Sequence, residues 1–78
     1  MLFLIEYDRL QGQVVSFRSF KASDASIAQD ARLLLELDLN RQGIKREIVV
    51  LEAADEDALR RTHRRYFGNL QELAEPLG

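Results

Sequence analysis

Four arginines near the end of the chain have the types and the spacing that could bind phosphate groups. They are Arg60, Arg61, Arg64 and Arg65. Residues three or four positions apart lie on the same side of a helix, and each guanidinium can donate two parallel hydrogen bonds to an oxyanion. A helix that begins near Asp55 would therefore present these arginines together to a nucleic-acid backbone.

The same segment also predicts that this basic face is partly neutralised. Glu56 precedes Arg60 by four residues, and Asp57 precedes Arg61 by four, which is the favourable order for ion pairs within a helix. Tyr66 falls on the other side of the helix, so it offers no surface on which bases could stack. A solvated helix face is the main interpretation of the pattern, and nucleic-acid binding is the alternative.

The remaining candidates for chemistry are isolated. His63 is the only histidine and cysteine is absent, so a set of nitrogen and sulfur ligands for a metal cannot be assembled. No spacing selects a nucleophile or a carboxylate as a partner for His63, which is expected to be half-buried with a backbone hydrogen bond. No glycine-rich phosphate loop occurs either. We therefore predict no catalytic residue, no metal and no cofactor, and the sequence gives no evident small-molecule ligand. An enzyme or ligand carrier that uses the space between helices and sheet is a third possibility.

Asp38 falls close to the apolar stripe that its own helix is expected to bury, which is formed by Ile27, Ala31, Leu34 and Leu35. A buried carboxylate needs a partner, which Arg41 or Lys45 could supply. Because helix ends often loosen, the second interpretation is that Asp38 lies in water.

Length and composition indicate one small folded domain. A chain of 78 residues can form a single domain, residues 1–78, with one modest core, and its 46% hydrophobic and 31% charged residues are typical of a globular protein. In these respects it resembles the small single-domain proteins of bacteria. The net charge of −2 gives no overall attraction to nucleic acid. The apolar start, residues 1–5, is too short to span a membrane, and the absence of cysteine favours the cytoplasm.

Periodicity predicts the order strand, strand, helix, strand, helix. Strands are expected over residues 2–8, 13–20 and 47–53, a first helix over 24–41, and a second helix within 53–67. Gly12 would supply a positive φ in the hairpin turn, and Gly43 a left-handed helix end. Residues 69–78 are expected to form a loose tail.

These elements predict an α+β fold. A helical connection makes the third strand parallel to the second, and placing it beside the first strand gives the order 2-1-3 with antiparallel neighbours. The expected architecture is a two-layer α/β sandwich of ββαβα order, in which both helices cover one face of a mainly antiparallel three-stranded sheet. The order of the first four elements is similar to the β-grasp fold of ubiquitin-like sulfur carriers, but the chain ends in Leu77-Gly78 and not in a double glycine, so the likeness implies no activity.

One face of such a sheet would lack a cover. In the second strand Val15 and Phe17 are expected on one face and Val14 and Phe20 on the other, so neither face is polar. Uncovered apolar patches usually mark interaction sites, although loops, the tail and arginine stems could cover this one instead. We predict a non-catalytic interaction or structural module that acts as a homodimer or binds a protein partner. The residues expected at its interaction surface are Phe3, Ile5, Phe17, Leu33, Leu37 and Val49.

Overall fold

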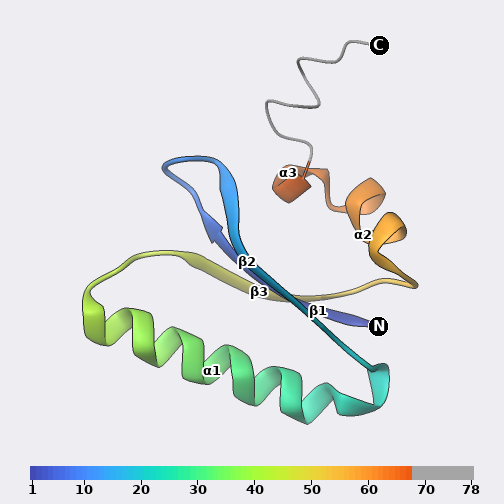
Figure 1. Cartoon of the computed structure of the whole chain (residues 1–78), viewed down its shortest axis with the longest axis horizontal. Coiled ribbons are helices and arrows are strands. Elements are labelled where there is room, and N and C mark those ends of the chain that lie inside the picture. Colours follow the sequence, from blue (N-terminus) through green and yellow to red (C-terminus); the bar gives the residue numbers. More distant parts are fainter. Residues whose placement is uncertain (68–78) are drawn as a thin grey trace, which may run out of the picture.

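The computed structural model describes residues 1–67, apart from the side chain of Arg65. Its elements have the predicted ββαβα order (Figure 1). They are β1 (Leu2–Asp8), β2 (Gln13–Phe20), a short 3-10 turn η1 (Ala22–Asp24), α1 (Ala25–Gln42), β3 (Glu47–Glu52), α2 (Glu56–Thr62) and α3 (Arg64–Phe67). The predicted tail, residues 69–78, lies outside the described residues.

The three strands form one antiparallel sheet with β1 at its centre. The strand order is β2-β1-β3, as predicted, and both outer strands run antiparallel to β1. The β1–β2 turn is closed by Asp8, whose carboxylate accepts hydrogen bonds from the backbone N–H groups of Leu10 and Gln11 at 3.0 and 3.1 Å. Gly12 has the predicted positive φ, 66°.

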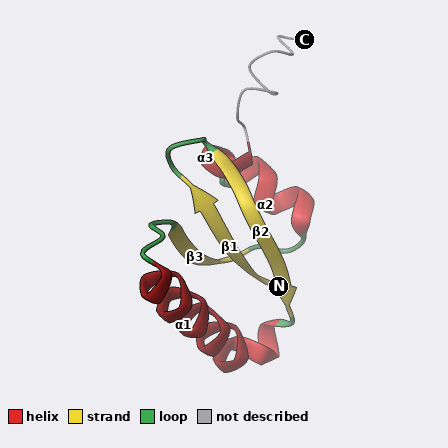
Figure 2. Cartoon of the chain, turned by 60° about the vertical axis from the view of Figure 1, so that its left-hand side comes forward, coloured by secondary structure: helices red, strands yellow, loops and turns green. Residues whose placement is uncertain are grey.

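The helices lie on opposite faces of this sheet, so the prediction that both cover one face is wrong. Leu4 packs with Ala28 of α1 in one core cluster. Phe3 and Ile5 pack with Leu59 of α2 in a second cluster. Figures 1 and 2 show α1 on one side of the strands and α2 with α3 on the other. Both faces of β1 are apolar, so each face needs its own cover, and the result is three layers.

A bulge in β2 changes which of its side chains face each core. The register shifts after Glu6, and because Tyr7 then pairs with Val14, Val15 is skipped. Val14 and Phe17 consequently pack against the same cluster, whereas simple alternation predicted opposite faces. Alternation counted along the sequence cannot include an inserted residue.

The C-terminal end of α1 follows the sequence prediction. Gly43 adopts a left-handed conformation with φ 73°, and its backbone N–H donates to the carbonyl of Asn40 at 3.1 Å. The N–H of Ile44 donates to the carbonyl of Leu39 at 2.9 Å. These bonds satisfy carbonyls that the helix end would otherwise leave without partners.

Replacing Gly43 by alanine is expected to lower the free energy of unfolding by about 1 kcal/mol, because a Cβ atom is strained in the left-handed region. No atom lies within 4 Å of the position that this Cβ would occupy, so the loss would come from the backbone alone. Urea unfolding measures it. Gly43→Asn is the matched control, and its loss should be smaller because asparagine tolerates this conformation. Equal stability of Gly43→Ala and the unchanged chain would contradict the assignment.

The predicted second helix is broken at His63. It begins as expected, because the carboxylate of Asp55 accepts a hydrogen bond from the N–H of Ala58 at 2.8 Å. The hydroxyl of Thr62 donates to the carbonyl of Ala58 at 2.8 Å, a bond of the kind that bends helices. His63 then has φ −121° and ψ 56°, outside the helical region. Tyr66 of α3 is nevertheless buried on the predicted side.

Candidate functional site

The four arginines do not share one continuous helix face. Arg60 and Arg61 lie in the last turn of α2, whereas Arg64 belongs to α3, beyond the break. The side chain of Arg65 lies outside the described residues. The regular spacing on which the phosphate-binding prediction depends is therefore interrupted between the second and third arginines.

Arg60 is occupied by neighbours in its own chain. It donates to the carboxylate of Glu56 from two nitrogens, at 2.6 and 3.1 Å, which confirms the predicted pair. Its guanidinium also lies 4.8 Å from the ring centroid of Phe67, within the range of a cation–π contact. A phosphate would compete with Glu56 for two of the three guanidinium nitrogens.

A polar cluster that the sequence interpretation did not include lies around Glu6 in β1. Glu6 is only 6% exposed, and its carboxylate accepts hydrogen bonds from Arg46 at 2.5 Å and from Ser16 at 3.1 Å. Arg46 also lies 3.8 Å from the carboxylate of Asp8. A charged residue inside an apolar strand is a signal that a partner is needed, but the partner here is 40 positions away along the chain.

The polar contacts continue at Glu47, the first residue of β3. The hydroxyl of Tyr66 donates to its carboxylate at 2.5 Å, and Arg9 lies 3.9 Å away. The rings of Tyr7 and Tyr66 meet edge to face with centroids 5.1 Å apart. Each carboxylate of the cluster thus has a cationic or hydroxyl partner, and together these contacts join β1, β3 and α3.

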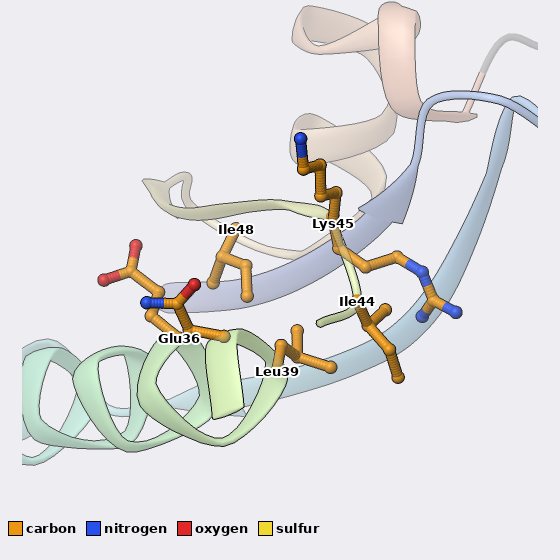
Figure 3. A pocket seen from close by; sticks show the side chains of 7 residues that line it. Glu36, Leu39, Ile44, Lys45 and Ile48 are labelled. Carbon is orange, nitrogen blue, oxygen red and sulfur yellow. The ribbon is translucent and has the colours of Figure 1, made fainter. Parts of the chain in front are cut away.

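An open cavity of about 290 Å³ lies between the last turns of α1 and the beginning of β3 (Figure 3). Leu39 and Ile48 approach each other across it, Ile44 borders it, and Glu36 lies at its rim, while Lys45 extends away from the helix. This volume is at the lower limit of the roughly 300–1,000 Å³ of ligand sites. The described lining residues include no nucleophile beside a base.

The two polar residues whose roles the sequence left open have local contacts. Asp38 is exposed and accepts a hydrogen bond from the side chain of Gln42 at 2.9 Å, so of the two interpretations the solvated one is confirmed. His63 is half-buried at the helix break, and its backbone N–H donates to the carbonyl of Leu59 at 2.9 Å.

The part of the chain that the structure describes contains neither a metal-binding group of side chains nor a helix suited to span a membrane. No three histidine or carboxylate side chains within it are grouped so that they could hold a metal ion. None of its helices has both the length and the apolar character needed to span a membrane.

Four of the six residues predicted at an interaction surface belong to the core. Phe3 and Ile5 are buried, and Phe17 and Val49 are half-buried against the same cluster. The prediction that this sheet face is uncovered is wrong because α2 and α3 lie over it. Only the helical part of the predicted surface remains open to solvent.

That part is the outer face of α1, which we define by four aliphatic residues. Their exposed fractions are 54% for Ile27, 53% for Leu33, 67% for Leu34 and 49% for Leu37. Leu33 and Leu37 were predicted there, whereas Ile27 and Leu34 were expected in the buried stripe. The spacing alone did not determine which side of the helix faces the sheet, because apolar residues occur around most of its circumference.

The inner side of α1 explains this rotation. The small residue Ala28 is fully buried against the sheet, and Leu39 is buried near the other end of the helix. Ala31 and Arg32 between them are half-buried. A surface helix usually carries one apolar stripe. Since α1 already packs against the sheet on one side and carries four aliphatic residues on the other, it has the pattern of a helix that is covered on both sides.

The fold defines a small α+β domain with a helical layer on each face of its sheet. Neither a protein-family model, nor a curated protein, nor a solved structure matches the chain. A fold of this kind implies no activity by itself.

Proposed function

We propose that the protein is a non-catalytic interaction module that forms a homodimer through the outer face of α1. One observation carries the proposal: Ile27, Leu33, Leu34 and Leu37 are each about half exposed or more. Removing apolar surface from water contributes roughly 25 cal/mol per Å². A partner that covers this face would therefore gain affinity from all four side chains.

A second copy of the chain is the partner that requires the fewest assumptions. In a two-fold symmetric dimer one patch packs against its own copy, so a single apolar helix face can be both halves of the interface. We place this dimer in the cytoplasm, because the chain lacks cysteine and gains nothing from an oxidising compartment.

Nucleic-acid binding through Arg60, Arg61, Arg64 and Arg65 is the weaker alternative. The ion pair of Arg60 with Glu56 and its contact with Phe67 compete with any phosphate. The net charge of −2 adds no general attraction.

Light scattering across a dilution series tests the proposal. The expected mass is twice the 9.0 kDa of the single chain, with a fall towards 9.0 kDa on dilution and no change when a mixed pool of short RNA and DNA is added at low salt. A mass of 9.0 kDa at every concentration would overturn the homodimer. If the mass rose only with nucleic acid, and salt reversed the rise, the arginine alternative would replace it.

A further inference from the structure

We infer that the two α1 helices of the dimer pack antiparallel, with Asp30 of each chain opposite the partner's Arg41. The inference rests on the proposed homodimer and specifies its geometry. The outward side of α1 carries a seam of residues that are spaced alternately three and four positions apart. The seam consists of Ile27, Asp30, Leu34, Leu37 and Arg41, and this spacing is that of the contact positions of a helix pair.

The members of this seam are available for contact. Asp30 and Arg41 are exposed, as are the three aliphatic residues. Within the described part of the chain neither Asp30 nor Arg41 takes part in an ion pair of its own protomer. Their charges are therefore free to act between protomers.

The charges select the direction of the pair. Along α1, the midpoint between Leu34 and Leu37 coincides with the midpoint between Asp30 and Arg41. A two-fold axis through that point, perpendicular to the helix, places Leu34 against the partner's Leu37 and Asp30 against the partner's Arg41. A parallel pair in register would instead place Asp30 against a second Asp30 and Arg41 against a second Arg41, and such like-charge contacts disfavour that arrangement.

The flank of α1 beside the seam is open. An open hollow runs between α1 and the edge strand β2, and it is lined by Arg18 of β2 and by α1 residues that include Asp30, Leu34 and Asp38. The sheet therefore does not close over this flank of α1. In the antiparallel pair the leucines supply most of the affinity, and the two Asp30–Arg41 contacts fix orientation and register.

Charge reversal tests the pairing. Asp30→Arg alone, and Arg41→Asp alone, should each weaken the dimer about tenfold, because both cross-contacts become repulsive. The double variant Asp30→Arg with Arg41→Asp should restore the dissociation constant to within about twofold, since the charges are exchanged. Arg61→Asp, a reversal at an exposed residue of α2, is the matched control and should leave the mass unchanged.

Disulfide trapping tests the direction, and the absence of cysteine from the chain gives a clean background. The Asp30→Cys and Arg41→Cys variants are mixed and oxidised, and the products are separated by mass. An antiparallel pair predicts mainly the mixed disulfide, because two copies of position 30 would be roughly 16 Å apart along the helix, whereas a disulfide needs Cα atoms within about 7 Å. One native Asp30–Arg41 contact remains in this mixed dimer.

The outcomes separate the two proposals. If the unchanged chain is monomeric throughout the dilution series, the homodimer fails and the helix pair fails with it. If the chain is dimeric but the single charge reversals leave its dissociation constant unchanged, or each cysteine variant cross-links mainly to itself, the antiparallel pair is wrong while the homodimer stands.

Discussion

Replacing Leu34 and Leu37 together by aspartate is expected to convert the proposed dimer into a 9.0 kDa monomer. The exposed part of each leucine is worth about 1 kcal/mol when it is removed from water, and each substitution occurs twice in the dimer. The combined loss of about 4 kcal/mol raises the dissociation constant roughly a thousandfold, and the desolvation of the new carboxylates adds to it. Sedimentation or light scattering measures the change.

The fold of this variant should persist. Leu34 and Leu37 are 67% and 49% exposed, so the isolated chain loses about 1 kcal/mol of helix propensity for the two positions and roughly another 1–2 kcal/mol from the covered part of each leucine and from the new aspartate between Asp30 and Asp38. Leu10→Asp is the matched control, because Leu10 is 98% exposed in the β1–β2 turn and lies outside the outer face of α1. It should remain dimeric. A double variant that stays dimeric and folded would place the interface elsewhere.

Arg46→Ala is expected to lower the free energy of unfolding by about 3 kcal/mol. Among the described residues, the substitution leaves the buried carboxylate of Glu6 with its hydrogen bond from Ser16 alone. Removing one partner of a buried pair typically costs roughly 3–5 kcal/mol. We expect a cost at the lower end of this range because the side chain of Arg46 is itself 23% exposed. For a domain of this size the melting temperature should fall by about 15 °C, as calorimetry or circular dichroism would show.

Two further variants identify the cause of that loss. Lys45→Ala changes the neighbouring exposed residue and should alter stability by less than about 0.5 kcal/mol. Adding Glu6→Gln to Arg46→Ala should recover part of the loss, because no unpaired charge then remains in the core. Equal stability of Arg46→Ala and Lys45→Ala would show that the buried pair has no structural importance.

Local patterns in the sequence were sufficient for the elements and their order. The bounds of β1 and β2, the left-handed Gly43 and the Asp55 cap all depend on residues within a few positions of one another. The strand order 2-1-3 follows from chain connectivity. Contacts of this range are encoded in spacing and backbone preference, so they can be predicted without knowledge of the rest of the chain.

The candidate site was predicted only in part, because burial depends on all the layers together. Leu33 and Leu37 were predicted on the surface and are exposed, whereas Phe3 and Ile5 are covered by helices that were expected on the other face. The side of α1 that faces the sheet was likewise settled by the fit of Ala28 against Leu4. Neither contact follows from periodicity in a helix that is apolar around most of its circumference.

The sequence by itself determined a small α+β domain with three strands in the order 2-1-3, helices at two places along the chain, and more apolar residues than two layers can bury. Only the tertiary structure decided that the helices lie on opposite faces, that Arg46 neutralises Glu6, and that the surplus of leucines is exposed on α1. The physical reason is the separation along the chain of the residues that interact. Hydrogen-bonding and capping preferences act between near neighbours, whereas exposure and ion pairing depend on which distant segments meet in space.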